Sequence, residues 1–252
     1  MSMFGNSNSM SNESFKDTNS SFGELSLPQD PFRILQLEEV EKIRVIENNE
    51  PIISLNQSAP DIICEYQKPA MIEKYGNKMF LREAVVEKLN AIQETIDKSE
   101  EFPAGTKLLV AYAYRYLSDQ KFFFEQALER MKNRYPEASN TELRRFANVE
   151  AAAPEVAGHP TGGAVDVTLR FRDGSMLDTG GGISDFSDPK VYPTLSEEIT
   201  EVQQKNRLII RDLMLEQGFA PFNGEWWHFS YGDKEWAAFY GQPNAIYEQV
   251  DI

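Results

Sequence analysis

Residues 158–166 read Gly-His-Pro-Thr-Gly-Gly-Ala-Val-Asp, and a strand-like run from Val165 to Phe171 overlaps the end of this stretch. His159 and Asp166 stand seven positions apart. On a regular strand an odd offset places two side chains on opposite faces. The two residues can therefore share a metal ion only if a turn or bulge intervenes, and the glycine pair at 162–163 offers one.

A second stretch, Gly-Glu-Trp-Trp-His at 224–228, ends in the other of the chain's two histidines. A catalytic zinc site takes three protein ligands and leaves a fourth position for water, so His159, Asp166 and His228 would suffice. Glu225 is the carboxylate nearest in sequence to a ligand and is the candidate general base. Only three positions separate it from His228, so the loop before Glu225 must turn its side chain into the site. From spacing alone, incidental histidines and ordinary core tryptophans remain an equal interpretation.

Hydrophobic periodicity around these stretches predicts long helices between isolated strands. Thr194 and Glu197 have capping-box spacing ahead of a long helix that stops at Gly218. Further helices are expected over 79–98, from Ser118 to just before Pro136, and over 140–149, with strands at Lys107–Tyr114 and near Trp227–Tyr231. This order favours an α+β fold in one domain, residues 29–252.

Composition excludes several classes of protein. The 252 residues include 40 acidic and 25 basic side chains, for a formal charge of −15. So acidic a surface repels phosphate backbones, and we expect no nucleic-acid partner. The single cysteine, Cys64, rules out an internal disulfide and a cysteine-based zinc site, and its apolar neighbours predict burial.

The first 28 residues are rich in serine and asparagine and show no hydrophobic period, so we expect a disordered tail over 1–28. No run is long enough for a membrane span. No secretory signal is visible, which predicts a cytoplasmic protein while leaving the periplasm or secretion open. The oligomeric state stays open as well.

The two motifs together resemble those of the VanX-type D-alanyl-D-alanine dipeptidases, which are related to D,D-carboxypeptidases and to the Hedgehog signalling domain. His-x-x-Gly-x-Ala-x-Asp at 159–166 resembles the first zinc motif of that family, and Glu225 to His228 resembles the second. Ala113-Tyr114-Arg115 resembles the end of the family's central strand. The resemblance extends over residues 40–240 and implies a Hedgehog/D,D-peptidase-like fold, with a small, mostly antiparallel sheet packed with helices and one zinc site.

The resemblance also implies a role for individual residues. His159, Asp166 and His228 match the ligands of one Zn²⁺ per chain, Glu225 matches the general base, and Arg115 matches the arginine that stabilises the oxyanion. Substrate-binding roles fall on Asp185, Trp227 and Tyr114. The sequence departs from the family at Ala157, where a serine is usual, and at Ile183-Ser184, where the family has the aspartate that binds the substrate's amino group. A shift of one residue nominates Asp185 for that contact.

The resemblance implies zinc-dependent hydrolysis of a short D-configured peptide, with D-Ala-D-Ala as the expected substrate. The first alternative is a D,D- or L,D-carboxypeptidase acting on cell-wall peptides. The second is a catalytically inactive, Hedgehog-like binding module.

Overall fold

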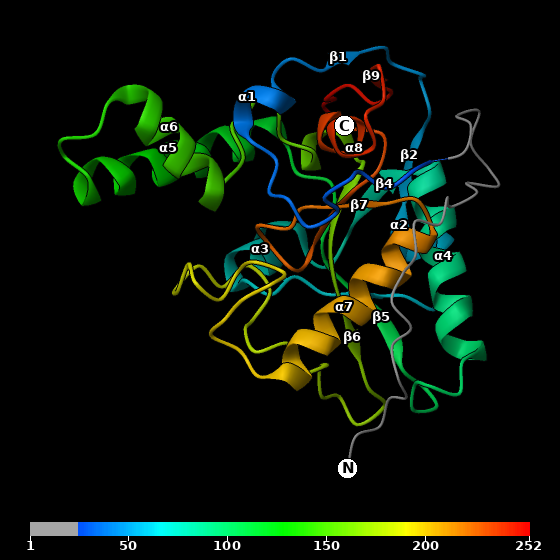
Figure 1. The fold of residues 1–252 in the computed structure, drawn as a ribbon. Coiled ribbons are helices and arrows are strands. Elements are labelled where there is room, and N and C mark those ends of the chain that lie inside the picture. The colour runs from blue at the N-terminus through cyan, green and yellow to red at the C-terminus, as the bar shows by residue number, and fades with distance from the viewer. Residues whose placement is uncertain (1–24) are drawn as a thin grey trace.

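The computed structural model describes residues 25–252, which form a central sheet surrounded by helices (Figure 1). In chain order, the elements are α1 (Leu37–Val40), β1 (Arg44–Val45), β2 (Ile52–Ser54), α2 (Leu55–Ser58), β3 (Ile63–Cys64), α3 (Pro69–Tyr75), β4 (Phe80–Arg82), α4 (Glu83–Lys98), β5 (Lys107–Tyr112), α5 (Leu117–Arg134), α6 (Asn140–Glu150), a 3-10 turn (His159–Thr161), β6 (Ala164–Arg170), α7 (Glu201–Glu216), β7 (Ala220–Pro221), β8 (His228–Ser230), α8 (Lys234–Tyr240) and β9 (Asn244–Ala245).

The largest sheet has five strands in the order β3-β5-β6-β8-β7. Only the β3–β5 pair is parallel, and the other three pairs are antiparallel. The predicted α+β class with a small, mostly antiparallel sheet is therefore confirmed. Strand β6 lies at the centre, and its residues Ala164 to Leu169 are all buried, because the sheet is covered on both faces.

A β-bulge interrupts the pairing of β5 with β6. Val110 pairs with Val167, but the next partner of β6, Asp166, pairs with Tyr112, so Ala111 is the extra residue. A bulge turns the following side chain to the opposite face. On the other edge of β6, Asp166 pairs with His228 of β8. Tyr112, Asp166 and His228 thus form one row across three neighbouring strands, and directly opposed residues point to the same face.

The helices cover this sheet unequally. Helix α4 carries an apolar face of Val85, Leu89, Ile92 and Ile96, each at most 2% exposed, and packs against β5. Helices α5 and α6 pack on each other as a hairpin that projects to one side of the molecule (Figure 1). No helix within residues 25–252 is long and apolar enough to cross a membrane.

Two predicted elements are shorter than expected. Residues 80–82, predicted as the first turn of the 79–98 helix, form strand β4, because they pair with β2. The strand predicted over 107–114 ends at Tyr112. Beyond it the chain leaves the sheet, and the Tyr114 backbone N–H donates to the Phe80 carbonyl instead.

The predicted start of the long helix at Thr194 is wrong. Helix α7 begins after Thr200, whose hydroxyl accepts a hydrogen bond from the Gln203 backbone while the Gln203 side chain accepts one from Thr200. Thr194 makes other contacts: its N–H donates to the Asn223 carbonyl and its own carbonyl accepts from the Gln204 side chain. The apolar neighbours of Cys64 predicted that it is buried, and in the structure it is partly buried.

The predicted tail, residues 1–28, falls mainly on residues 1–24, which lie outside the described part of the chain. Its last four residues are described, and there Leu25 is fully buried in the hydrophobic core. The ordered core therefore includes residues that precede the predicted boundary at 29.

Arg82 joins three distant segments around the 3-10 turn. Its Nε donates to the Thr161 carbonyl at 2.8 Å, and its guanidinium pairs with Glu47 at 3.0 Å. The same group donates to the carbonyls of Glu50, at 2.6 Å, and Glu248, at 3.1 Å. The side chain is 2% exposed, so this network fixes the turn from the buried side.

Replacing Arg82 with methionine is expected to lower the free energy of unfolding by about 3–5 kcal/mol, because Glu47 and three carbonyls lose their partner inside the protein. Urea denaturation of the full chain measures this change. The matched control is Arg145→Met, since Arg145 forms an exposed ion pair with Glu38, and such a pair contributes at most about 1 kcal/mol. Equal stabilities for the two variants would contradict the role given to Arg82.

Candidate active site

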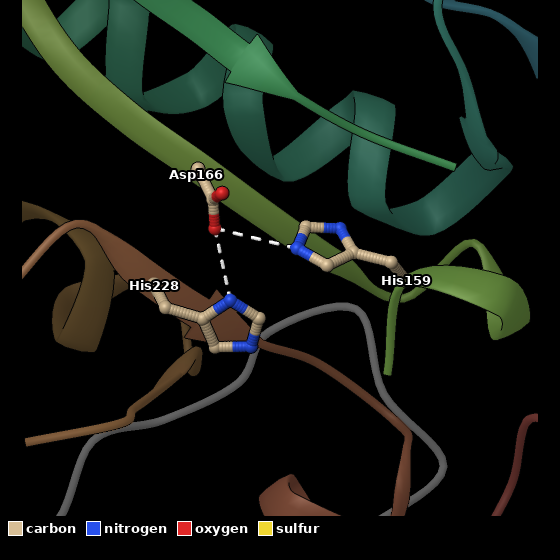
Figure 2. Close-up of side chains that lie close together, drawn as sticks. All are labelled: His159, Asp166 and His228. Carbon is tan, nitrogen blue, oxygen red and sulfur yellow. Dashed lines mark hydrogen bonds and ion pairs between the residues drawn. The ribbon is translucent and has the colours of Figure 1, made fainter. Parts of the chain in front are cut away.

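Two histidines and an aspartate meet in the interior, as Figure 2 shows. Asp166 Oδ1 lies 3.4 Å from Nε2 of His159 and 2.9 Å from Nδ1 of His228. One ligand atom from each side chain lies within 4.8 Å of the other two, and all three residues are buried. The structure thus brings together the three residues that the sequence nominated as metal ligands.

The turn required by the spacing of His159 and Asp166 is present. His159 lies in the 3-10 turn, which ends at Gly162 with a φ of +75°, a left-handed conformation that suits glycine. The chain then enters β6 at Ala164. Because of this change of direction, His159 approaches Asp166 from outside the strand. The rule that an odd offset places two side chains on opposite faces of a strand therefore does not apply to this pair.

A backbone contact sets the tautomer of His159. Its Nδ1 lies 2.8 Å from the Ala113 carbonyl oxygen, which is only an acceptor, so Nδ1 carries the proton. Nε2, on the side facing Asp166, then keeps its lone pair. Metal-binding histidines are commonly oriented in this way by a carbonyl or a carboxylate on the other ring nitrogen.

Glu235 orients His228 in a similar manner, and sequence reasoning did not identify it. Its carboxylate lies 3.3 Å from Nε2 of His228, while Nδ1 faces Asp166. The Ser230 hydroxyl donates to the same carboxylate at 3.3 Å. Glu235 is on α8, seven residues beyond His228 and across a turn, so no strand or helix periodicity links the two.

The electrostatics of the cluster favour a cation beside Asp166. Burial alone would raise the pKa of Asp166, but the His159 and His228 rings lower it below its usual value. Burial would lower the pKa of His228, but hydrogen bonds to Asp166 and Glu235 raise it well above its usual value. For His159 burial dominates and lowers the pKa. The neutral imidazole of His159 beside an ionised carboxylate is donor chemistry that suits zinc, and a bound zinc ion would take the place of the proton that His228 holds.

We use the name central pocket for the cavity beside the cluster, which is lined by His159, Asp166 and His228 together with Glu225 and Arg115. Glu225 reaches it from a turn, because its N–H donates to the Phe222 carbonyl and its carbonyl accepts from the His228 N–H. Burial raises the pKa of Glu225 to about 8, and the charge on nearby His228 only partly opposes this rise. A carboxyl group tuned toward neutral pH suits proton transfer.

Arg115 is held at the rim of the central pocket by fixed contacts. Its Nη1 donates to the Gln120 side chain at 2.9 Å, and its backbone N–H donates to the His159 carbonyl. The guanidinium carbon lies 5.7 Å from the centre of the Tyr112 ring and 5.3 Å from that of Phe123. Its Nε is buried and has no hydrogen-bond partner among the residues that the structure describes.

The three predicted substrate-binding residues do not line the central pocket. Asp185 lines a separate pocket beside Gly181. Trp227 is 1% exposed and packs among aromatic rings in the core. The Tyr114 hydroxyl donates to the Val250 carbonyl at 2.7 Å.

Other residues line the central pocket instead, one of which, Ser184, stands at the position that matches the family's aspartate without a shift. They include Ser184 and Phe186 on either side of Asp185, together with Lys68. Ala157, which stands where the resembling family has serine, lines the pocket too but offers no hydroxyl.

The sequence is similar to known proteins along most of its length. The family model described as D-ala-D-ala dipeptidase matches residues 72–248. A D-alanyl-D-alanine dipeptidase from Synechocystis sp. is 27% identical over 191 residues, which cover 68% of this chain and 76% of that protein. A D-alanyl-D-alanine dipeptidase from Enterococcus faecalis is 28% identical over 137 residues, 52% of this chain and 64% of that protein. Among solved structures, an LdcB LD-carboxypeptidase aligns over 93% of this chain and 90% of its own, with a TM-score of 0.42 and 18% identity, and this similarity carries no functional conclusion.

Proposed function

The chain belongs to the D-Ala-D-Ala dipeptidase family and is a metallopeptidase of that type, and from this premise we propose that it hydrolyses D-Ala-D-Ala or a closely related D-configured dipeptide. The observation that carries the proposal is the convergence of His159, Asp166 and His228 beside a pocket that Glu225 and Arg115 also line.

One zinc ion per chain is the proposed cofactor, held by Nε2 of His159, a carboxylate oxygen of Asp166 and Nδ1 of His228. The fixed tautomer of His159 and the contact of His228 with Glu235 both leave the inner nitrogen for a metal. A bound zinc ion lowers the pKa of its water and polarises a scissile carbonyl.

Glu225 is the proposed general base and Arg115 the proposed oxyanion-stabilising group. Glu225 lies in the central pocket. A carboxylate whose pKa is near neutral can take a proton from water and then deliver that proton to the leaving amine. Arg115 also lines this pocket, and the positive charge of its guanidinium would stabilise the negative charge that develops on the substrate oxygen.

A panel of D,D-, L,L- and mixed dipeptides, given to zinc-loaded protein, tests the proposed function. We expect hydrolysis of D-Ala-D-Ala and little or none of L-Ala-L-Ala, together with close to one zinc per chain by metal analysis. Absence of hydrolysis of every D,D-dipeptide by zinc-loaded protein would reject the dipeptidase proposal.

The position of Asp185 favours one alternative, a D,D- or L,D-carboxypeptidase acting on longer cell-wall peptides. Asp185 was the expected partner of the substrate's free amino group, but it lies in a different pocket. A site without that partner has less reason to require a free amino terminus. N-acetylation of the substrate separates the two activities, because a carboxypeptidase tolerates it and a dipeptidase does not.

Replacing Glu235 with glutamine is expected to weaken zinc binding by about 10–100-fold, the usual effect of losing the group that orients a metal-binding histidine. Competition with a zinc-binding dye measures the affinity without relying on turnover. Glu94→Gln is the matched control, because Glu94 is exposed on α4 and, among residues 25–252, pairs only with Lys98. Unchanged zinc affinity in Glu235→Gln would show that His228 is oriented without it.

A further inference from the structure

Hydrogen-bond donors without partners gather on one side of the central pocket. Lys68, Tyr112 and Arg115 all line it, as do the ligands His159 and Asp166. The Tyr112 hydroxyl and Arg115 Nε are buried without a hydrogen-bond partner in the part of the chain that the structure describes. An unsatisfied buried donor costs about 1–3 kcal/mol, so an acceptor from outside the chain would stabilise these two groups.

Lys68 is a cation without a carboxylate partner. It lies just before α3, and its ammonium is 5.5 Å from the centre of the Phe186 ring, which also lines the pocket. Within residues 25–252 it makes no ion pair. The side chain lines the central pocket, and the charges of Arg115, Asp166 and Glu225 all act on its ammonium.

The third cation of the pocket is already neutralised. Arg130 lies 2.8 Å from the carboxylate of Glu150, and both residues line the pocket. Arg115 is fixed by Gln120 beside the metal cluster, where it serves the reacting carbonyl. Lys68 is therefore the cation left for a second negative group on the substrate.

Tyr112 faces the pocket because of the bulge at Ala111. With regular pairing, Ala111 and not Tyr112 would lie opposite Asp166. The bulge places a phenol in the row with Asp166 and His228, at a position 3% exposed. Burial raises the pKa of this phenol, and the charge of Asp166 raises it further, so the group is a neutral O–H donor at physiological pH.

From these contacts we propose that Lys68 and Tyr112 form the subsite for the C-terminal carboxylate of the substrate. This proposal rests on the proposed peptidase function. A peptide with free ends carries one anion, its terminal carboxylate, and Lys68 lines the pocket without an ion-pair partner among residues 25–252. Lys68 thus sets the direction of the bound peptide and restricts cleavage to the bond that releases one C-terminal residue.

The test compares D-Ala-D-Ala with its C-terminal carboxamide, using zinc-loaded full-length protein in which Glu225→Gln prevents turnover. Calorimetry measures the dissociation constants. We expect the free acid to bind at least about tenfold more tightly than the amide, and Lys68→Met to weaken binding of the acid by about 10–100-fold without changing that of the amide. Tyr112→Phe is expected to weaken binding of the acid by about tenfold.

Lys98→Met is the matched control, because it removes the same charge from an exposed position on α4, where the one ion pair in the described part of the chain is with Glu94. Equal binding of acid and amide, or equal losses for both ligands in Lys68→Met, would overturn the carboxylate subsite. A fall in kcat for Lys68→Met with unchanged binding would also overturn it, since Lys68 would then act on the transition state. Failure of the proposed function is a separate result, namely no hydrolysis by the unmodified protein.

Discussion

Replacing Glu225 with glutamine is expected to reduce the rate of D-Ala-D-Ala hydrolysis by at least about 100-fold, while the protein retains its zinc. Glutamine keeps the size of the side chain and its place on the turn before β8, but it cannot accept a proton. Because Glu225 is outside the His159–Asp166–His228 cluster, its replacement leaves all three proposed ligands unchanged.

Steady-state kinetics measure the rate of hydrolysis, and metal analysis of the same preparation measures the zinc content. Glu94→Gln removes a carboxylate from the exposed face of α4 and is expected to leave both rate and zinc content unchanged. Full turnover in Glu225→Gln would exclude this residue as the base. Loss of zinc together with activity would instead make it part of the metal site.

Replacing Asp166 with asparagine is expected to lower zinc affinity by more than about 100-fold, beyond the usual effect of changing a group that only supports a ligand. Asp166 is the one anion that lies between both rings, 3.4 Å from His159 and 2.9 Å from His228. The amide is nearly isosteric but neutral, so the site loses the charge that attracts a dication.

Thermal unfolding with and without added zinc gives a readout that does not depend on catalysis. Zinc binding to the folded state raises the melting temperature of the unmodified protein, and Asp166→Asn is expected to lose this shift at the same zinc concentration. An undiminished shift would place the metal elsewhere. The melting temperature without zinc serves as the control for folding, since it reports the variant's stability independently of metal.

Sequence reasoning identified the elements whose patterns are local. The apolar period of α4 and the apolar run of β5 both predicted their elements. Such patterns can be recognised within a short stretch of sequence, because they follow from which side chains of that stretch are buried. Sequence reasoning placed the start of α7 too early, because Thr194-x-x-Glu197 and Thr200-x-x-Gln203 are equivalent as local signals. Tertiary contacts of Thr194 decided between them.

The candidate site divides in the same way. His159, Asp166 and His228 were accessible to prediction, since few residue types bind zinc and the chain has only two histidines. Glu235 and Lys68 were not, because each reaches the pocket from a different helix end and neither stands in a motif. The placement of Asp185 outside the central pocket depends on the path of a loop that no periodicity describes.

The position of Asp166 on the central strand has a consequence for motion. Val165 and Val167 on either side of it are fully buried, and its own strand is bonded on both edges. Segments of that kind exchange their amide hydrogens only when a protein opens globally. The geometry of two proposed ligands, Asp166 and His228, is thus protected by the whole free energy of folding. Lys68 precedes the seven-residue helix α3, which lies outside this sheet, so its position does not depend on the strand pairing that fixes Asp166.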